Sequence, residues 1–194
     1  MNVLKKYLRQ SLLSALILGA ANSACAANLL VNGSFESPGC AVSCVLDTPE
    51  KANFITGWTT FLSGAEYFNM AASIPYGVAA DGAVIVDLAN YIYQNGGGIQ
   101  QNFATVVGAK YRLKFSAGNV IYGGRSGNGV IQVKVAGQTV NFNTPVATSS
   151  TVVWDVITYD FTATTPQTTL AFSNEQNPYS HYAFIDNVSV ESIP

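Results

Sequence analysis

The sequence is poor in charged side chains: only 10% of its 194 residues are Asp, Glu, Lys or Arg, while 48% are hydrophobic. So few charges exclude a disordered chain, which needs low hydrophobicity and high net charge to stay unfolded. Three of the nine basic residues are Lys5, Lys6 and Arg9, so the rest of the chain carries six basic against eleven acidic residues. A mildly acidic protein without a basic patch binds nucleic acid poorly, so we expect no nucleic-acid partner.

Histidine is also scarce, and its scarcity limits the possible chemistry. His181 is the single histidine, which excludes a metal site built from several imidazoles, and any Ser-His-Asp triad would have to use it. The nucleophile motif G-x-S-x-G does not occur. The glycine-rich stretches at 96–98 and 123–129 are not followed by the G-K-[ST] of a phosphate loop. Nothing singles out two of the eleven acids for glycoside hydrolysis. We therefore predict that the protein is not an enzyme.

No apolar run is long enough to span a membrane. The longest candidate, 11–20, follows Lys5, Lys6 and Arg9 and precedes the small residues Ala24-Cys25-Ala26. This order of a basic region, a short apolar region and small residues is typical of a secretory signal peptide. We predict a leader at 1–27 and one mature domain at 28–194, secreted to the extracellular space or the periplasm, with no membrane span in the mature chain. A lipoprotein acylated at Cys25 is the less favoured alternative, because Asn22 replaces the expected aliphatic residue.

Cysteine is used three times, and cleavage of the leader removes Cys25. Two cysteines that remain in an exported chain are expected to be oxidised. Because Cys40 and Cys44 lie only four positions apart, we predict a disulfide that closes a local loop rather than a metal site.

Helical periodicity is missing from the mature chain, and strand periodicity is frequent. Apolar and polar residues alternate at Tyr111, Leu113 and Phe115, and again at Ile131, Val133 and Val135. Such alternation is typical of strands with one face in water. Strands are predicted at 29–35, 66–68, 83–88, 98–106, 111–117, 130–135, 139–142, 152–161, 168–173 and 183–190, with a long loop at 37–53 and a tight turn at 136–138. Many short strands without an internal repeat or linker predict an all-β fold, an antiparallel β-sandwich.

The two ends of the mature chain carry the most recognisable motifs. N-G-S-F-E (32–36), G-W (57–58), A-E-Y-F (65–68), D-G-A-V-I-V-D-L (81–88), G-I-Q-Q (98–101), Y-R-L-K-F-S-A-G (111–118) and I-D-N-V (185–188) occur in this order. In this order the chain resembles the choice-of-anchor C family and the related plant cell-wall family, domain of unknown function 642. Both are similar to carbohydrate-binding modules with a galactose-binding-like jelly roll. The resemblance implies this fold with more certainty than any activity, because one fold hosts many functions.

The resemblance also implies a structural calcium ion. Glu36 follows the first predicted strand, and Asp186 lies within the last. In a jelly roll these two termini can be neighbours, and a hard cation binds carboxylates together with backbone carbonyl oxygens. We expect Glu36 and Asp186 to bind one calcium ion that joins the first strand to the last.

Tyrosine occurs ten times, often in predicted loops beside amide or basic side chains. Flat aromatic rings stack on the C–H faces of sugars, while polar side chains bond the hydroxyl groups. The loop residues that fit this pattern are Tyr91, Tyr93, Gln94, Tyr122, Arg125, Tyr179 and His181. Trp58 and Trp154 are expected in the core instead.

Two functions remain open at this stage. The favoured one is a non-catalytic protein that binds cell-wall or extracellular-matrix polysaccharide. The alternative is a structural or adhesive matrix protein whose partner is another protein or a cell surface.

Overall fold

The computed structural model describes residues 27–70, 72, 77–90, 96–174 and 176–194. The predicted leader therefore lies outside the described residues, apart from Ala27. In the described part, the strands are β1 (Ser43–Leu46), β2 (Thr59–Leu62), β3 (Ala65–Asn69), β4 (Val84–Asp87), β5 (Gly97–Ala104), β6 (Lys110–Asn119), β7 (Gly127–Asn128), β8 (Val130–Val135), β9 (Gln138–Asn143), β10 (Val153–Thr162), β11 (Gln167–Ser173), β12 (His181–Tyr182) and β13 (Phe184–Ile193), with one short 3-10 helix, η1 (Pro49–Lys51). No helix in these ranges is long and apolar enough to cross a membrane.

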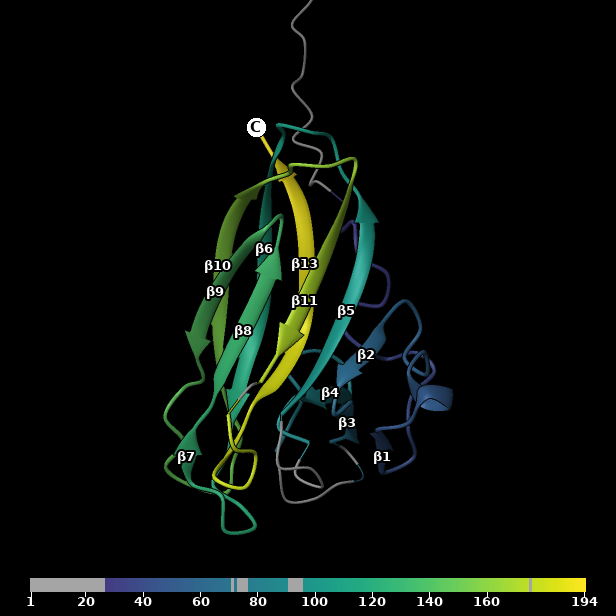
Figure 1. The fold of residues 1–194 in the computed structure, drawn as a ribbon. Coiled ribbons are helices and arrows are strands. Elements are labelled where there is room, and N and C mark those ends of the chain that lie inside the picture. Colours follow the sequence, from purple (N-terminus) through teal and green to yellow (C-terminus); the bar gives the residue numbers. More distant parts are fainter. Residues whose placement is uncertain (1–26, 71, 73–76, 91–95, 175) are drawn as a thin grey trace, which may run out of the picture.

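The strands form two antiparallel sheets that pack face to face (Figure 1). Sheet A has the order β1-β3-β4-β13-β6-β10, and sheet B has the order β2-β5-β11-β8-β9. β7 and β12 form a separate parallel pair. The predicted antiparallel β-sandwich is confirmed, and the strands predicted at 130–135 and 168–173 agree with β8 and β11 to within a residue.

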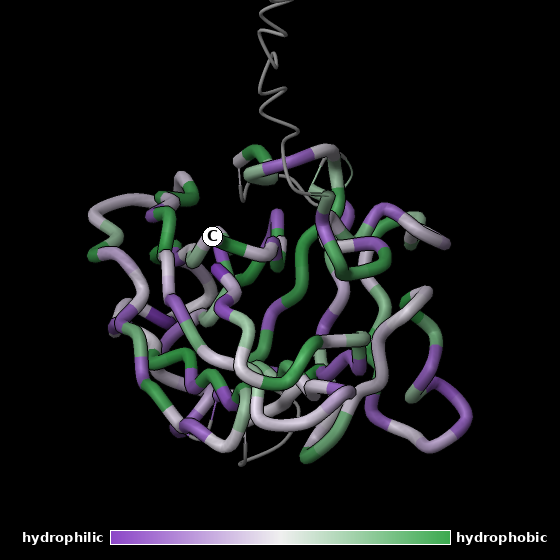
Figure 2. The backbone as a smooth tube through the Cα atoms, turned by 90° about the horizontal axis from the view of Figure 1, so that it is seen from above, coloured by the Kyte–Doolittle hydropathy of each residue, from purple (hydrophilic) through white to green (hydrophobic). Residues whose placement is uncertain are grey.

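The main core lies between the two sheets and follows from the alternation of residues along the strands. Seen from above, hydrophobic and hydrophilic residues alternate along the backbone (Figure 2). The inward residues include Phe115 of β6 and Phe172 of β11, whose rings lie 5.0 Å apart in a T-shaped contact. Trp58 packs on Phe172 and is 2% exposed, so the prediction that it is a core residue is confirmed. Aromatic contacts of this kind between the sheets stabilise a sandwich by more than the burial of their apolar area alone.

A second, smaller apolar cluster covers the outer face of sheet A. It consists of Phe68, Met70, Ile85, Val120, Val152, Tyr182 and Phe184, with Trp154 packed against it. Trp154 was predicted in the core, but it is only partly buried and packs on this second cluster instead. Its indole N–H donates a hydrogen bond to Val78 O at 3.0 Å. Because loops cover this part of sheet A, polar residues on its outer face are also buried.

The opening stretch from Leu29 to Phe35 is not a strand, which corrects the sequence prediction. Asn32 and Phe35 adopt positive φ angles of 54° and 60°, which break an extended conformation. The stretch nevertheless lies beside β13, because Leu29 N donates to Val190 O at 2.8 Å and Val188 N donates to Gly33 O at 2.8 Å. The expected proximity of the two ends is therefore found, without a regular strand ladder.

The segment from Ser37 to Asn53, predicted to be a long loop, contains β1 and η1. β1 pairs with β3, with Cys44 opposite Tyr67. Cys44 is bonded to Cys40, so the predicted disulfide is confirmed. The short disulfide-closed loop gives no hydrophobic periodicity, which explains why the sequence did not indicate a strand here.

Candidate functional site

Two loops from distant parts of the sequence meet at the end of the sandwich opposite the C-terminus (Figure 1). They are residues 120–129 and residues 176–182, and we call them the tyrosine loops after Tyr122 and Tyr179. The parallel pair β7 and β12 joins them. Ser126 N and Gly127 N both donate to Ser180 O, at 3.1 and 2.8 Å. The sequence predicted binding residues on both loops, and the structure places these loops side by side.

Arg125 holds the two tyrosine loops to sheet A from inside. Its guanidinium lies 3.5 Å from the centre of the Tyr182 ring, a cation–π contact. The same group donates to the carbonyl oxygens of Pro178 and His181, at 3.4 and 3.3 Å, and lies 3.5 Å from Asp87 Oδ2. Arg125 is only 7% exposed. The structure thus places it beneath the surface at which the sequence analysis expected it to bond a sugar.

His181 is also buried, at 2% exposure, rather than at a binding surface. Its Nδ1 lies 3.0 Å from Ser180 Oγ, and its Nε2 lies 3.1 Å from Asn174 Oδ1. Burial lowers the pKa of His181, and the nearby charge of Arg125 lowers it further. A neutral imidazole that is bonded on both sides positions the loop backbone and has no nitrogen left for a ligand.

The two tyrosines that name the loops remain partly open to solvent. Tyr122 is 38% exposed, and Tyr179 is 50% exposed. The backbone of Tyr122 is fixed by paired hydrogen bonds with Arg125, at 3.1 and 2.9 Å. Tyr179 N donates to Asn177 Oδ1 at 3.0 Å. The remaining predicted binding residues, Tyr91, Tyr93 and Gln94, lie outside the described residues.

A pair of buried acids beneath the tyrosine loops was not singled out from the sequence. Glu66 of β3 and Asp87 of β4 are directly opposite each other in the sheet register. Asp87 Oδ1 accepts hydrogen bonds from Ala89 N and Ala183 N, at 2.9 and 3.1 Å. In the described part of the chain, Glu66 Oε2 and Asp87 Oδ2 are buried without a hydrogen-bond partner. The positive charge of Arg125 therefore lies beside two carboxyl groups.

Burial, together with the neighbouring charge of Asp87, raises the pKa of Glu66 to about 7, although the charge of Arg125 opposes this shift. Burial also raises the pKa of Asp87, although Arg125 and two backbone N–H groups oppose this shift. The sequence did carry a signal for this pair: both acids belong to motifs noted above, A-E-Y-F and D-G-A-V-I-V-D-L. The apolar neighbours of these acids suggested only buried strands, and the cross-strand pairing needed the structure.

The two predicted acids, Glu36 and Asp186, bind backbone N–H groups of one loop from two sides. Glu36 Oε1 accepts hydrogen bonds from Ala83 N and Val84 N, both at 2.8 Å. Asp186 Oδ2 accepts one from Asp81 N at 2.8 Å. We call this arrangement the acid clip. The clip thus joins the N-terminal stretch, the loop at 81–84 and β13.

Gly82 lies at the centre of the acid clip. Its φ angle is +63°, and a Cβ atom at this position would lie 2.4 Å from Glu36 Oε1. Only glycine therefore allows the loop to approach the carboxylate so closely. Asp186 is fully buried, and burial raises its pKa to about 7, to which the charge of Asp81 also contributes.

The chemistry of the acid clip can be compared with the needs of the expected calcium ion. In the described chain no salt bridge neutralises Glu36 or Asp186. Two carboxylates without a basic partner suit a hard cation. However, no group of three or more His, Cys, Asp or Glu side chains in the described ranges is placed to hold a metal ion. The clip fits calcium only if backbone carbonyl oxygens complete the shell.

A family model described as "Protein of unknown function (DUF642)" matches residues 28–191. This range includes the acid clip, the Glu66–Asp87 pair and both tyrosine loops. No curated protein matches the chain. The family description therefore names no activity that could be compared with the site.

Among solved structures, a Bacteroides thetaiotaomicron VPI-5482 protein named for sugar binding is similar with a TM-score of 0.57. It is 11% identical, and the alignment covers 86% of this chain and 100% of that one. TmCBM61, solved with β-1,4-galactotriose, has a TM-score of 0.49 at 16% identity over 86% of this chain and 99% of that one. A family 35 carbohydrate binding module from Clostridium thermocellum has a TM-score of 0.45 at 16% identity, covering 79% and 100%. At these identities the likeness is one of fold.

Proposed function

Because the chain belongs to the DUF642 family, whose function is unknown, its activity has to be argued from its site. We propose that it is an exported, non-catalytic carbohydrate-binding protein. Its ligand is a polysaccharide of a cell wall or an extracellular matrix. It binds with the rings of Tyr122 and Tyr179, and a calcium ion in the acid clip stabilises the fold.

The proposal rests on one observation: two partly exposed tyrosines lie on adjoining loops whose backbone is held by hydrogen bonds from the buried Arg125. Tyr122 and Tyr179 project from backbone that Arg125 fixes from below. Rigid rings lose little conformational entropy when they stack on a sugar, so such mounting favours binding. The shared fold with a protein named for sugar binding supports the same class of ligand.

A binding role rather than catalysis is supported by the burial of the acids. Glycoside hydrolysis needs two carboxyl groups that flank a substrate in an open cleft. Glu66 and Asp87 face each other, but they are 5% and 0% exposed, so a sugar cannot reach them. Their raised pKa values follow from burial beneath the tyrosine loops, without any catalytic requirement.

Export is supported by the leader-like N-terminal sequence and by the disulfide between Cys40 and Cys44. Disulfides persist in oxidising compartments outside the cytosol. The calcium proposal rests on Glu36 and Asp186, which would neutralise part of the ion's charge. A bound ion would fix the loop at 81–84 against β13 and would take no part in sugar chemistry.

Affinity electrophoresis in gels that contain soluble neutral polysaccharides tests the proposed function. We expect retardation that corresponds to a Kd in the micromolar to millimolar range, as befits few stacking contacts. The Tyr122→Ala/Tyr179→Ala double variant should bind at least fivefold more weakly. The matched Tyr122→Phe/Tyr179→Phe variant keeps both rings and should bind like the parent. Absence of retardation by every polysaccharide would refute sugar binding and favour a protein or cell-surface partner. Equal binding by both double variants would refute the role of the tyrosine loops.

A further inference from the structure

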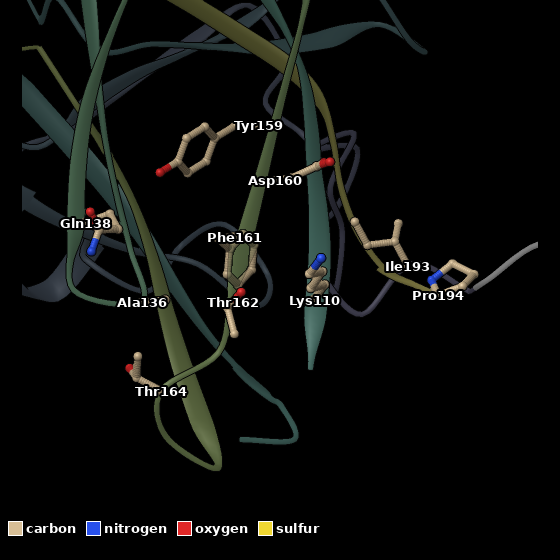
Figure 3. Close-up of a pocket in the computed structure, with 10 residues that line it drawn as sticks. All are labelled: Lys110, Ala136, Gln138, Tyr159, Asp160, Phe161, Thr162, Thr164, Ile193 and Pro194. Atoms are coloured by element: carbon tan, nitrogen blue, oxygen red, sulfur yellow. The ribbon is translucent and has the colours of Figure 1, made fainter. Parts of the chain in front are cut away.

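Two adjoining depressions lie at the end of the sandwich away from the tyrosine loops. The first has a volume of about 560 Å³ and is lined by β9, β10 and their surroundings (Figure 3). The second, about 330 Å³, lies on sheet B. Both volumes fall in the range of about 300–1,000 Å³ that is usual for ligand pockets. Ala136 and Gln138 line both depressions, so the β8–β9 turn is their common border. We call the combined feature the hairpin groove.

The turn that divides the hairpin groove is narrow. Ala136 and Gly137 have positive φ angles of 49° and 78°, as in a two-residue hairpin turn. A Cβ atom at Gly137 would meet nothing within 4 Å. A bound chain could therefore pass from one depression to the other over the turn without meeting a bulky side chain.

Two aromatic residues line the first depression, the partly buried Tyr159 and the buried Phe161, so Tyr159 is the ring that a ligand can reach beside hydroxyl and amide groups. In Figure 3, Tyr159 lies on the same side of β10 as Gln138, while Lys110 and Asp160 lie on the other side. Tyr159 is partly buried, and its ring is held in a T-shaped contact with Phe142 at 6.1 Å. Gln138 and Thr164 are exposed. A fixed ring beside amide and hydroxyl groups suits a pyranose, which has an apolar face and polar edges.

Charges in the hairpin groove largely cancel. Asp160 accepts two hydrogen bonds from Arg112, both at 2.8 Å. This bonding lowers the pKa of Asp160, and Lys110 contributes to the same shift. The five strands of sheet B contain no Asp or Glu. Apart from Lys134 and the opposed charges of Lys110 and Asp160, the groove is lined by uncharged side chains, which favour a ligand rich in hydroxyl groups.

The second depression extends across four strands of sheet B. It is lined by Thr139 of β9, Lys134 of β8, Thr169 of β11 and Gln100 of β5. Three strand spacings amount to roughly 14 Å. This span suits several linked sugar units rather than one.

We infer that the hairpin groove is a second glycan-binding surface, which binds an extended neutral oligosaccharide across the β8–β9 turn. The ring of Tyr159 stacks on one sugar unit, and the Gln138 amide bonds its hydroxyl groups. This inference rests on the proposed function. With binding at both ends of the sandwich, one molecule could link two polysaccharide chains.

The test is an NMR titration of the ¹⁵N-labelled protein with cellohexaose, xylohexaose and β-1,4-galactotetraose, with oligogalacturonate as the charged comparison. For a neutral oligosaccharide, we expect amide shift changes at residues 136–138 and 159–164 in addition to those in the tyrosine loops. Gln138→Ala and Tyr159→Leu should each raise the Kd measured from the groove signals at least fivefold. Tyr159→Phe, which keeps the ring, and Asn141→Ala, an exposed change on the same strand outside the groove, should leave it unchanged.

The dispersion of each spectrum reports whether the variant is folded, so that a loss of binding is not confused with unfolding. Shift changes confined to the tyrosine loops would overturn the second surface and leave the proposed function intact. A response in the groove to oligogalacturonate alone would overturn the inferred neutral ligand. No shift change with any oligosaccharide would overturn the proposed function and the inference together.

Discussion

The outer faces of the two sheets are used in opposite ways. The strands of sheet A carry all of the strand acids, namely Glu66, Asp87, Asp155, Asp160, Asp186 and Glu191, and three of these are buried beneath the protein's own loops. The strands of sheet B carry none. On sheet A, buried carboxylates attach loops through Arg125 and backbone N–H groups. Sheet B instead presents mainly uncharged hydrogen-bonding groups to solvent, with Lys134 as the charged side chain of its strands. The acids thus serve the architecture, and the uncharged surfaces are left for a ligand.

The largest expected effect comes from removing the cation of the buried network. Arg125→Met leaves Asp87 without its partner and removes the hydrogen bonds to Pro178 O and His181 O. Breaking a buried pair from one side costs about 3–5 kcal/mol of the free energy of unfolding. Urea denaturation at pH 7 measures this cost.

Arg112→Met is the matched control. It breaks the Arg112–Asp160 pair, whose side chains are 51% and 46% exposed, so the free energy of unfolding should hardly change. Equal losses from Arg125→Met and Arg112→Met would contradict the structural role of the buried network. Adding Asp87→Asn to Arg125→Met should restore part of the stability, because the unpaired charge of Asp87 is then absent.

Calcium is expected to act through the acid clip with a somewhat smaller effect. An ion that binds only the folded chain adds about 2.7 kcal/mol at a hundredfold excess over its Kd. Chelation should lower Tm, and added calcium should restore it. In Glu36→Gln and Asp186→Asn variants the Tm should not respond. If the Tm of the parent protein does not change on chelation, and elemental analysis confirms that the metal has been removed, the proposed calcium site is wrong.

The pH dependence of stability should follow from the buried acids of sheet A. Glu66 and Asp186 have pKa values of about 7 in the folded protein, against ordinary values of 4.5 and 3.8. Between these values the folded chain binds more protons than the unfolded chain, so the free energy of unfolding falls as pH rises from about 4 to 7. The stabilisation is fully present below pH 4 and is lost as pH rises through 7.

The Glu66 share of this pH effect should be about 2 kcal/mol. A rise of the pKa from 4.5 to about 7 would give more than this at about 1.36 kcal/mol per pKa unit, but Glu66 and Asp87 titrate together, which reduces the share of Glu66. Glu66→Gln should flatten the curve by that amount. Urea denaturation in chelator at pH 5 and pH 8 measures it. A parent protein that is more stable at pH 8 than at pH 5 would reverse the predicted sign.

The sequence predicted the fold better than the site, for physical reasons that particular residues illustrate. Alternation along β6 and β8 reports directly which residues face the core, so these strands were predicted closely. The local disulfide also followed from two nearby cysteines. The stretch from Leu29 to Phe35 has the same alternation, but positive φ angles at Asn32 and Phe35 prevent a strand. These two residues are held by contacts that are distant in the sequence, such as Asn32 O with the Trp58 indole N–H and Phe35 O with the Tyr67 hydroxyl, and sequence periodicity does not contain such contacts.

Candidate site residues were harder to predict because burial of polar side chains depends on tertiary structure. In the sequence, Arg125 and His181 lie in polar loops and suggest surface residues, yet both are buried. Arg125 contacts Asp87 and Tyr182, and His181 forms a hydrogen bond with Asn174. Glu66 and Asp87 lie 21 positions apart in the sequence and meet only through the β3–β4 register. Glu36 and Asp186 were identified from a resemblance, and the structure brings them to one loop. Whether they bind calcium stays a prediction.

The most direct test of the separation between structural acids and ligand surfaces is a calorimetric titration with a soluble neutral polysaccharide. It should be performed with and without excess chelator, at a temperature where the metal-free protein remains folded. The account predicts binding with a Kd in the micromolar to millimolar range that is the same in both conditions, because no acid contacts the sugar. Binding that disappears with the chelator while the protein stays folded would contradict it, as would the absence of binding to any neutral polysaccharide.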